Sequence, residues 1–384
     1  MKIGIEAQRI FRKKKHGMDI YALELIRNLQ MIDQINEYYI FVRPGEDRCL
    51  KETSNFKIIE IKALTYADWE QIQLPRVAAL YDLDLLHCTS NTAPIFSPAP
   101  LHLTLHDIIY LHQEFSGGSL YQRLGHYYRK WIVPLAYRKA KKVFTVSNFE
   151  KKQIDAHFGD SDKVSVVYNG VSDRFQPASK EVIGAVKVRY ELPQHFIFFL
   201  GNTAPKKNME GLLQAYHLYR TKEKKPMKLV IAESSEEDLD KMLSKLHLEE
   251  LRQDIVLTGY VPQKDLPALY SAADLFVYPS LRESFGIPIL EAMACGTAVI
   301  TSNTSSMPEV AGLAAKQVDP FIPESIAMGI SDYLSSYKYF KRFTISEGLA
   351  RAEKFSWEVA ARMVTNHYQN RNVQYSRISD LMSV

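Results

Sequence analysis

Residues 275–296 hold a strand, a glycine turn and a short helix in close succession, and this order constrains the fold more than any other stretch. The apolar run over 275–279 has the length and composition of a buried strand. Pro288 is favoured in the first turn of a helix, because proline has no N–H to leave unpaired there. Gly296 is a typical residue for ending a helix. The stretch therefore predicts a helix from near Pro288 to near Cys295, in a strand–loop–helix unit of an α/β sheet.

Two carboxylates, Glu283 and Glu291, flank the turn in an E-x7-E spacing. The start of the helix presents free N–H groups and the positive end of the helix dipole, which together favour an anion. A carboxylate one turn into that helix cannot bind a phosphate, but Glu291 can accept hydrogen bonds from neutral hydroxyls such as those of a ribose. Glu283, on the loop, can do the same for a sugar. On spacing alone, two surface acids are the simpler interpretation.

Strand and helix patterns alternate along both halves of the chain, and the second half repeats the plan of the first. The strands expected in the first half lie at 2–6, 38–42, 56–61, 84–88, 101–105, 142–147 and 163–170. Those expected in the second half lie at 196–200, 228–232, 255–259, 275–279 and 298–300. Alternating strands and helices predict parallel sheets with helices on both faces.

The length of 384 residues suits two domains of ordinary size. We expect an N-terminal Rossmann-like domain over 1–172, completed by a C-terminal helix at about 360–384, and a second Rossmann-like domain over 173–359. The predicted fold class is therefore α/β, with a deep cleft between the two domains. Ligands are expected at the carboxyl ends of the parallel strands, where open α/β sheets bind them.

The composition is that of a soluble globular protein, with 46% hydrophobic and 24% charged residues. The sequence contains no apolar run of about 18 residues, the length that a spanning helix needs. The N-terminus opens directly as a strand and lacks the apolar core and cleavage site of a signal peptide. The three cysteines, Cys49, Cys88 and Cys295, are far apart and lack metal-ligand spacing. These features predict a cytoplasmic protein without a disulfide framework.

Basic residues are concentrated between residues 120 and 152, which hold nine Lys or Arg and a single acid, Glu150. The aromatic residues of this stretch include Tyr121, Tyr127, Tyr128 and Trp131. Basic and aromatic side chains together suit an anionic lipid surface, so peripheral contact with the inner face of the cell membrane is one expectation. A solvated helix face backed by core aromatics explains the pattern equally well. Nucleic acid is a weaker candidate, because no recognised binding motif accompanies the charges.

The wording from Tyr278-Pro-Ser through EAMACGTAVI, which ends at Ile300, resembles the retaining glycosyltransferases of group 1, also called GT4. The signature of that family is an E-x7-E pair in this setting. Two further phrases are similar to it: the Tyr-Asn-Gly-Val run ending at Val171, and NTSSMPE over 303–309. These sequence segments resemble those of bacterial surface-polysaccharide mannosyltransferases. The resemblance implies a GT-B fold and transfer of a hexose, with mannose as the first candidate, from a nucleotide diphospho-sugar to a growing glycan or lipid-linked acceptor.

The resemblance also implies roles for residues of the second domain. Glu291 would hold the ribose of the donor, and Glu283 the hydroxyls of the donor sugar. Lys207, supported by Lys206, would contact the diphosphate and take part in catalysis. The family has an Arg-Lys pair where this chain has two lysines. Lysine cannot form the bidentate hydrogen bonds to a phosphate that arginine forms. The other donor contacts implied are Tyr260 and Val261 at the base and Ser284, Phe285, Gly286 and Ile287 at the diphosphate. No metal and no bound cofactor are expected.

In the first domain, the phrase LTLHDI resembles the family's His-Asp loop, which faces the reacting sugar. By this correspondence we expect His106 at the catalytic site and Asp107 in donor binding. For an isolated His-Asp pair, a role in capping the loop is the simpler alternative. The family's first loop is glycine-rich, and only Gly17 remains of it, in a loop expected over 9–19 before a helix at 20–31. Gly17 is expected to contact the donor.

Three other functions stay open at this point. A related GT-B enzyme, such as a nucleotide-sugar epimerase or a phosphorylase, would not transfer sugar to a separate acceptor. A dinucleotide-dependent oxidoreductase needs G-x-G-x-x-G after a strand, and the sequence contains no such run. A non-catalytic binding protein would keep the fold, but the joint presence of His106, Lys207, Glu283 and Glu291 argues against it.

Overall fold

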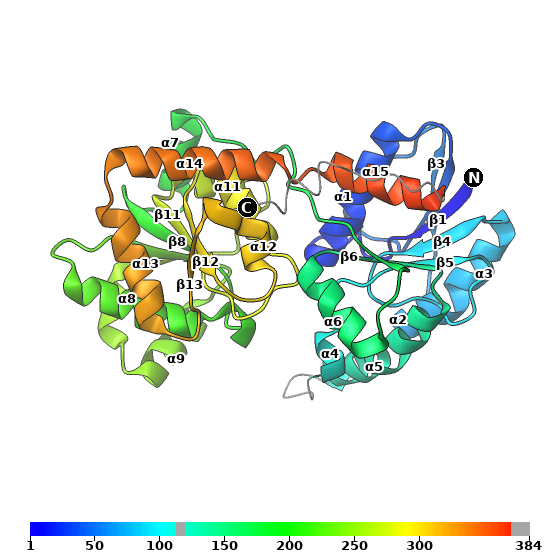
Figure 1. Cartoon of the computed structure of the whole chain (residues 1–384), viewed down its shortest axis with the longest axis horizontal. Helices are drawn as coiled ribbons and strands as arrows, with labels where there is room; N and C mark the ends of the chain where they lie inside the picture. The colour runs from blue at the N-terminus through cyan, green and yellow to red at the C-terminus, as the bar shows by residue number, and fades with distance from the viewer. Residues whose placement is uncertain (113–119, 370–384) are drawn as a thin grey trace. The chain divides into compact units, whose positions relative to one another are not determined.

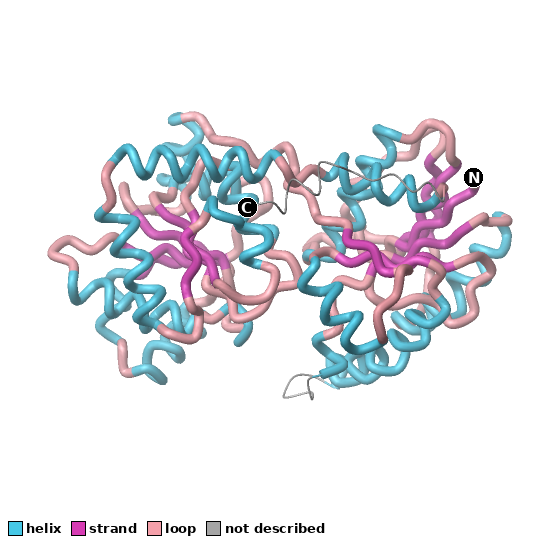
Figure 2. Tube along the Cα trace, viewed as in Figure 1, coloured by secondary structure: helices cyan, strands magenta, loops and turns pink. Residues whose placement is uncertain are grey.

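A computed structural model describes residues 1–112 and 120–369 of the chain. These residues fall into two units, one made of Met1–Gly170 with the residues from Trp357 on, and the other of Val171–Ser356. We call them unit 1 and unit 2. In each unit the strands form one central sheet, and helices pack on its two faces (Figure 1, Figure 2).

The sheet of unit 1 has the strand order β3-β2-β1-β4-β5-β6-β7, and all neighbouring strands are parallel. The strands are β1 (Lys2–Glu6), β2 (Glu37–Val42), β3 (Phe56–Glu60), β4 (Leu85–Cys88), β5 (Leu101–Thr104), β6 (Lys142–Thr145) and β7 (Val164–Val166). The helical segments are α1 (Gly17–Ile32), α2 (Tyr66–Asp68), η1 (Trp69–Gln73), α3 (Leu74–Ala78), η2 (Ala79–Tyr81), α4 (Ile109–His112), α5 (Leu120–Lys139), α6 (Asn148–Phe158) and α15 (Trp357–Tyr368). The strand order reverses between β1 and β4, so the loops after these two strands form the expected ligand-binding edge.

Unit 1 is completed by α15, the helix that returns from the far end of the chain. Strand β1 is buried on both faces, as expected for a central strand of a parallel sheet, and its Ile3 and Ile5 have no exposed surface. The hydroxyl of Tyr368 on α15 lies 2.6 Å from Nδ1 of His87 on β4. Nε2 of the same imidazole lies 2.8 Å from the hydroxyl of Thr104 on β5. This buried chain of hydrogen bonds fixes the closing helix to the sheet.

Unit 2 repeats the plan with the strand order β10-β9-β8-β11-β12-β13, again with all neighbours parallel. The strands are β8 (Phe196–Leu200), β9 (Lys228–Ala232), β10 (Ile255–Gly259), β11 (Leu275–Tyr278), β12 (Val299–Ser302) and β13 (Lys316–Val318). The helical segments are α7 (Lys180–Arg189), η3 (Pro205–Lys207), α8 (Met209–Lys222), α9 (Glu236–Leu246), η4 (Glu249–Asp254), α10 (Leu266–Ala272), α11 (Ile287–Ala294), α12 (Met307–Ala311), η5 (Gly312–Ala314), α13 (Pro323–Ser335) and α14 (Lys338–Glu353). Here the strand order reverses between β8 and β11, which places the ligand edge at the loops after these strands.

The first helix begins earlier than the sequence pattern predicts. Helix α1 starts at Gly17 rather than near residue 20, because the carboxylate of Asp19 accepts a hydrogen bond from the backbone N–H of His16 (3.0 Å) and satisfies the helix start. The expectation of a loop around Gly17 is therefore wrong. Gly17 is the first helical residue, it is exposed, and a Cβ added to it would meet no atom within 4 Å.

Two other elements depart from the sequence-based expectations. The strand expected over 163–170 is shortened to Val164–Val166, which pairs with β6 at the edge of the sheet in the described part of the chain. Strand β13, an edge strand of the unit 2 sheet, was not predicted, because its three residues (Lys-Gln-Val) are too few and too polar to give a strand pattern. Both departures lie at sheet edges and leave the ligand-binding loops unchanged.

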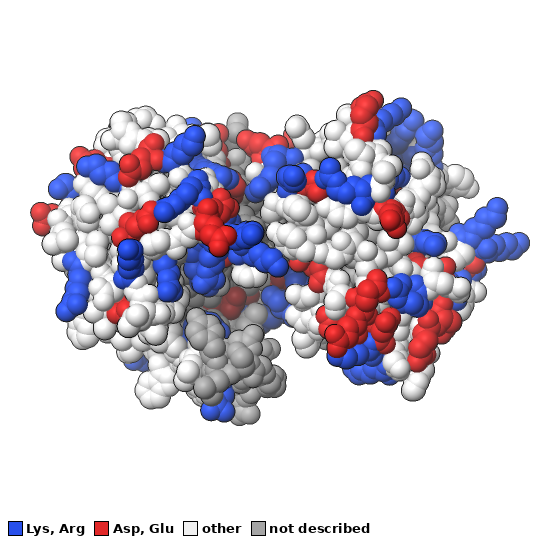
Figure 3. Space-filling model, turned by 180° about the vertical axis from the view of Figure 1, so that it is seen from behind, with Lys and Arg blue, Asp and Glu red and all other residues white. Residues whose placement is uncertain are grey.

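The surface carries both signs of charge. On the face that Figure 3 draws, basic and acidic side chains are interspersed over both units. This mixture agrees with the formal net charge of +4 in 384 residues. None of the helices in residues 1–112 and 120–369 combines the length and apolar character needed to span a bilayer.

Candidate functional site

Lys207, Tyr278 and Glu283 meet at the ligand edge of unit 2. The ammonium group of Lys207 donates to Glu283 Oε1 (2.7 Å) and to the hydroxyl of Tyr278 (2.6 Å). That hydroxyl in turn donates to the same carboxylate oxygen (2.9 Å). Lys207 follows β8, whereas Tyr278 ends β11 and Glu283 follows it, and β8 and β11 are neighbours. Parallel pairing of the two strands thus brings together residues about 70 positions apart in sequence.

Glu283 is held as a carboxylate by its neighbours. Its residue is only 9% exposed, and this burial acts to raise its pKa. The opposing effects of Lys207, Lys206 and the Tyr278 hydroxyl are stronger together, and they hold the pKa of Glu283 below its ordinary value. The two lysines differ in exposure: the Lys207 side chain is 20% exposed and that of Lys206 is 53% exposed, with Lys206 Nζ 3.9 Å from Glu283 Oε2. Lys207 is therefore pre-positioned, while Lys206 is more accessible to a ligand.

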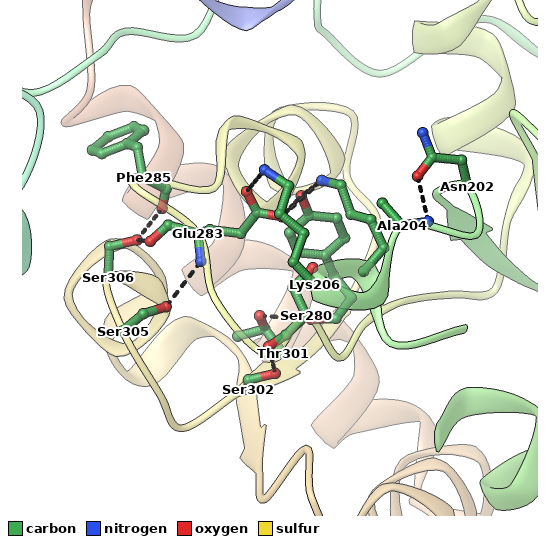
Figure 4. Close-up of polar contacts among 12 residues, drawn as sticks. Asn202, Ala204, Lys206, Ser280, Glu283, Phe285, Thr301, Ser302, Ser305 and Ser306 are labelled. Atoms are coloured by element: carbon green, nitrogen blue, oxygen red, sulfur yellow. Dashed lines mark hydrogen bonds and ion pairs between the residues drawn. The ribbon is translucent and has the colours of Figure 1, made fainter. Parts of the chain in front are cut away.

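Serine side chains hold the loop that carries Glu283. The backbone N–H of Glu283 donates to Ser305 Oγ (3.1 Å). Ser306 Oγ donates to the carbonyls of Glu283 (2.8 Å) and Phe285 (2.9 Å). Figure 4 shows Glu283 between Lys206 and this pair of serines. These serines belong to the NTSSMPE segment over 303–309. The segment therefore stabilises the conformation of the loop that carries Glu283.

Asn208 connects the lysine loop to the carboxylate loop. It has a positive φ of 59°, a conformation that asparagine tolerates better than most residues. Its side-chain oxygen accepts from the N–H of Gly211 (3.2 Å) and caps α8. Its amide nitrogen donates to the carbonyls of Pro279 (3.0 Å) and Pro320 (2.7 Å). Sequence reasoning passed over Asn208 and Tyr278, although a polar residue directly before a helix is a recognisable capping signal.

Helix α11 matches its sequence-based prediction closely. It spans Ile287–Ala294, with Gly286 as N-cap at φ 100° and Cys295 as C-cap. Gly296 follows at φ 74°, the left-handed conformation that ends many helices. No side chain caps the helix start in the described part of the chain, so the helix presents its first amides and the positive end of its dipole.

Glu291 lies one turn into α11 and is partly exposed. Its Oε2 accepts a hydrogen bond from the buried hydroxyl of Tyr270 (3.1 Å). Burial raises the pKa of Glu291 to about 7, against the smaller opposing effects of Tyr270 and the positive charge of Arg174. The carboxylate is therefore close to its titration point near neutral pH. A ligand that donates hydrogen bonds to it would favour the ionised form.

Of the other residues expected at the donor site, Phe285 and Val261 can contribute only through their backbone. The ring of Phe285 is buried against Phe355, with 5.8 Å between ring centroids, so it does not face a ligand. The side chain of Val261 is also buried, whereas Tyr260, which follows β10, is 52% exposed. Ser284 and Ile287 are partly exposed on either side of Gly286.

In unit 1, His106 is a buried residue of the loop that follows β5, two residues beyond the end of the strand. Its Nε2 lies 2.9 Å from the carbonyl of Thr89, which can only accept, so Nε2 carries the proton. Its backbone N–H donates to Asn91 Oδ1 (2.6 Å), and its ring meets Tyr21 edge-on at 4.7 Å. Burial lowers the pKa of His106, so the imidazole is neutral at pH 7. Asp107 accepts from the N–H of Ile109 (3.3 Å) at the start of α4, which is the local capping contact.

Two further polar residues, Gln8 and Arg9, lie at the ligand edge of unit 1. Sequence reasoning did not identify either of them as a site residue. Gln8 lies two residues beyond β1 and is 4% exposed, yet neither its amide oxygen nor its amide nitrogen has a hydrogen-bond partner within the described residues. Arg9 follows, with Nε 3.5 Å from Asp19 Oδ1 and its guanidinium 5.7 Å from the centre of the Tyr66 ring. Gln8 is a single polar residue after a strand and belongs to no recognised motif, so the sequence does not single it out.

A saturated carboxylate, Glu70, fixes the surrounding loops of unit 1. It accepts from the hydroxyls of Tyr66 (2.9 Å), Thr92 (2.5 Å) and Tyr128 (2.5 Å). Burial raises the pKa of Glu70, and the three hydroxyls oppose that effect. Glu70 thus joins α2, α5 and the loop after β4, and Gln8, in contrast, keeps its hydrogen-bonding capacity.

No group of three or more His, Cys, Asp or Glu side chains in residues 1–112 and 120–369 has an arrangement suited to a metal ion. Two of the three D-x-D triplets in the sequence, Asp82–Asp84 and Asp238–Asp240, have local roles. Asp84 accepts from the N–H of Lys2 (2.7 Å), and Asp238 accepts from the hydroxyl of Ser235 (2.8 Å) at the start of α9.

Family models match both halves of the chain. One, described as glycosyl transferases group 1, covers residues 187–346, and another, described as glycosyltransferase family 4, covers residues 16–175. The chain belongs to the group 1 glycosyltransferases. This confirms the resemblance drawn from the E-x7-E segment, and it places the Lys207–Glu283 pair in the half matched by the first model.

Relatives of this group 1 glycosyltransferase include enzymes of O-antigen synthesis. The O-antigen chain mannosyltransferase B of Escherichia coli is 37% identical over 235 residues, which is 60% of this chain and 61% of that protein. The serotype-specific mannosyltransferase WbdA of Escherichia coli is 32% identical over 250 residues, 64% of this chain but 30% of that protein. The matches thus span about three fifths of the first relative and under a third of the second.

The fold is that of GT-B glycosyltransferases. The structure of Anabaena Alr3699/HepE, solved in complex with UDP and glucose, covers 96% of this chain and 99% of its own with a TM-score of 0.73. At 17% identity this likeness concerns the fold alone. It confirms the prediction of two Rossmann-like domains for this glycosyltransferase.

Proposed function

We propose that this group 1 glycosyltransferase moves a hexose from a nucleotide diphospho-sugar to a glycan or lipid-linked acceptor of cell-surface polysaccharide synthesis. One observation carries the proposal: Lys207, Tyr278 and Glu283 are hydrogen-bonded together at the switch point of the unit 2 sheet, directly before the open N-terminus of α11. A cation, a carboxylate and the N-terminus of a helix at one edge suit a ligand with a diphosphate and a sugar.

The donor is proposed to bind unit 2. The first amides of α11, near Phe285, Gly286 and Ile287, would accept the diphosphate together with Lys206 and Lys207. Fixed positive groups there stabilise the charge that develops on the leaving nucleoside diphosphate, a task that a metal ion performs in other transferases. No metal or bound cofactor is required for this arrangement.

The two carboxylates, Glu283 and Glu291, would bind the uncharged hydroxyl groups of the donor. Glu291, partly exposed on α11, would accept hydrogen bonds from the ribose hydroxyls, and Glu283 from hydroxyls of the sugar. Tyr260 and the backbone of Val261 would contact the base. Glu283 also holds Lys207 in place, so its loss would affect both the sugar and the diphosphate.

Transfer is proposed to retain the anomeric configuration. The bond from the sugar C1 to the phosphate oxygen breaks, and the acceptor oxygen forms its bond to C1 on the same face of an oxocarbenium-like ion pair. The acceptor proton passes to an oxygen of the departing diphosphate. The neutral His106, with Nε2–H bound to the carbonyl of Thr89, presents Nδ1 as an acceptor that can steady a sugar hydroxyl.

The acceptor is proposed to bind the ligand edge of unit 1. Gln8 offers a buried amide with one donor group and one acceptor group, and a sugar hydroxyl can satisfy both. The nearby guanidinium of Arg9, 20% exposed in its side chain, can donate to further oxygens. Gly17, at the start of α1, and Asp107, between β5 and α4, remain proposed contacts to the donor.

GDP-mannose is proposed as the donor and a mannose-containing surface glycan as the acceptor. The support is the kinship to O-antigen mannosyltransferases at 30–37% identity. A uridine diphospho-sugar is the competing donor, because the solved neighbour HepE holds UDP and glucose.

Peripheral contact with the inner face of an anionic membrane is proposed for α5. Leu124, Tyr127, Trp131 and Leu135 are 60%, 51%, 75% and 37% exposed, and their spacing of three and four residues places them on one face of the helix. Arg123, Lys130 and Arg138 lie beside this stripe and are exposed. An apolar stripe bordered by cations is the pattern of a helix that lies in the headgroup region. The side chain of Tyr121, part of the same sequence pattern, lies outside the described residues.

The test is a product assay with purified protein. GDP-mannose, UDP-glucose and UDP-galactose are each supplied with mannose-terminated oligosaccharides, and products are analysed by mass spectrometry and by the anomeric coupling in NMR spectra. We expect transfer of one hexose with retention, and its loss in the Glu283→Gln variant. Conversion of a donor without acceptor would indicate an epimerase, and nucleotide binding without any product would indicate a binding protein.

A further inference from the structure

Helix α14 of unit 2 exposes an unusual run of aromatic side chains at its start. Tyr337 is its N-cap, and Lys338–Glu353 is the helix. Tyr337, Tyr339, Phe340 and Phe343 are 89%, 82%, 52% and 54% exposed. Folded proteins seldom leave a contiguous group of large rings in water without a partner for them. We therefore expect a binding partner to cover these aromatic side chains.

The rings lie on the face of α14 that is turned away from the body of unit 2. The other end of the helix packs on α11 through Gly348, where an added Cβ would come 3.3 Å from Met293. Ala352, one turn further, is also buried. At 3.6 residues per turn, Tyr339, Phe340 and Phe343 fall in one sector, roughly opposite to Gly348 and Ala352. Figure 1 shows α14 along the outside of unit 2, beside α11.

Cations alternate with the rings, and acids are absent from the segment. Lys338, Lys341 and Arg342 are interleaved with the aromatic residues, and the sequence from 333 to 346 contains no Asp or Glu. Lys341 bonds back to the carbonyl of Leu334 (2.7 Å), whereas Lys338 and Arg342 are exposed. The two exposed cations flank the aromatic sector on one side.

The end of the helix itself adds positive potential. In the part of the chain that the structure describes, no side chain caps the start of α14, so its first amides and the positive end of its dipole face outward. Positive charge, uncapped amides and interfacial rings on one projecting helix end are complementary to phosphate headgroups with acyl chains beneath them.

We propose that residues 337–343 form a second lipid-contacting surface, on unit 2, that binds an anionic membrane independently of α5. Lys338 and Arg342 pair with headgroup phosphates, and Tyr339, Phe340 and Phe343 enter the boundary between headgroups and acyl chains. A protein partner is less suited, because the surface is a projecting helix end rather than a groove or a flat apolar face. The inference does not depend on the transfer reaction, since these residues lie apart from Lys207 and Glu283.

The experiment is co-sedimentation of the full chain with vesicles of phosphatidylcholine containing phosphatidylglycerol, at low salt. Two variants test the surface: Lys338→Glu with Arg342→Glu, and Tyr339→Ser with Phe340→Ser and Phe343→Ser. The matched control is Lys224→Glu with Lys225→Glu, which makes the same charge change on an exposed loop of the same unit. We expect each surface variant to lower vesicle binding at least fivefold and the control to change it less than twofold.

A third set of variants, Tyr127→Ser with Trp131→Ser on α5, separates the two surfaces. If only the α5 variant lowers binding, or if charge loss anywhere lowers it equally, the proposal for α14 is overturned. Sedimentation velocity without lipid provides the other decisive result. A change of mass in the α14 variants would show that the surface joins protein chains, which also overturns the proposal. Transfer to a soluble acceptor should be unchanged, so failure of this inference and failure of the proposed reaction can be told apart.

Discussion

The ligand edges of the two units are built in different ways. In unit 2 the charged groups satisfy one another before any ligand arrives: Lys207 bonds to both Glu283 and Tyr278, and serines hold the loop. In unit 1 the polar groups come from separate strand ends, and Gln8 keeps both ends of its amide unpaired within the described residues. The ligand edge of unit 2 is pre-organised, whereas the ligand edge of unit 1 keeps unused hydrogen-bonding groups among the described residues.

This difference agrees with a division of labour between the units. A diphosphate and its leaving charge are best stabilised by groups that need not reorganise during the reaction. The enzyme has to distinguish its acceptor from similar sugars. A buried amide gives such selectivity, because it is satisfied only by a sugar whose hydroxyl group lies within hydrogen-bonding distance. The comparison therefore predicts that changes in unit 2 affect turnover and donor binding, and that changes in unit 1 affect the acceptor.

The largest effect is expected for Lys207→Ala. The change removes positive charge from the proposed diphosphate site and leaves the buried Glu283 without its closest partner. Turnover should fall about 100-fold, which corresponds to about 2.7 kcal/mol in the activation free energy. Steady-state kinetics with saturating acceptor measures it. Lys206→Ala, at the more exposed neighbour, is the matched control and should cost less.

Asn208→Ala tests whether the edge of unit 2 is pre-organised by its loops. The variant removes a helix cap, worth about 1 kcal/mol, and leaves the carbonyls of Pro279 and Pro320 without their donor, which costs about 1 kcal/mol more. Hydrogen exchange should show faster exchange at residues 206–211 and 279–283. Equal protection in the two proteins would mean that other contacts hold these loops.

Glu291→Gln should raise the donor KM about tenfold, or about 1.4 kcal/mol. Because the pKa of Glu291 is about 7, the wild-type donor KM should fall as pH rises from about 6 to about 8, while that of the variant stays flat. Without donor the sign is reversed. Ionised Glu291 is unfavourable in the fold, so wild-type stability should fall relative to the variant as pH rises from the ordinary value of 4.5 to about 7. Thermal unfolding across that range checks it.

Gln8→Leu addresses the edge of unit 1 and should have the smallest effect on the reaction. The leucine is similar in size and removes both hydrogen-bonding groups, so the acceptor KM should rise about fivefold, near 1 kcal/mol. The donor KM should not change. Removal of an unpaired buried amide should also leave the protein as stable as before or more so. An altered donor KM with a normal acceptor KM would reverse the assignment of the two edges.

The sequence predicts the edge of unit 2 much better than that of unit 1, for a physical reason. Glu283, Gly286 and Glu291 lie in one strand–turn–helix segment, whose proline and glycine signals fix its geometry locally. Tyr278 and Asn208 escaped notice because their roles depend on a contact across the sheet between β8 and β11.

In unit 1 even the local signals were misleading. The helix α1 begins at Gly17, because the capping contact from Asp19 to His16 adds a turn that the apolar pattern does not show. Gln8 has no signal in sequence, since its importance arises from the lack of a hydrogen-bond partner among the described residues of the folded chain. Contacts between distant segments decide both cases.

Calorimetric titration of a nucleoside diphosphate into wild-type protein, Lys207→Ala and Gln8→Leu tests the central claim most directly. That claim is that the diphosphate binds at the edge of unit 2, on pre-positioned positive groups. The account predicts that Lys207→Ala weakens binding at least tenfold and that Gln8→Leu leaves the affinity unchanged. Equal affinity in the wild type and Lys207→Ala, or a loss confined to Gln8→Leu, would contradict it.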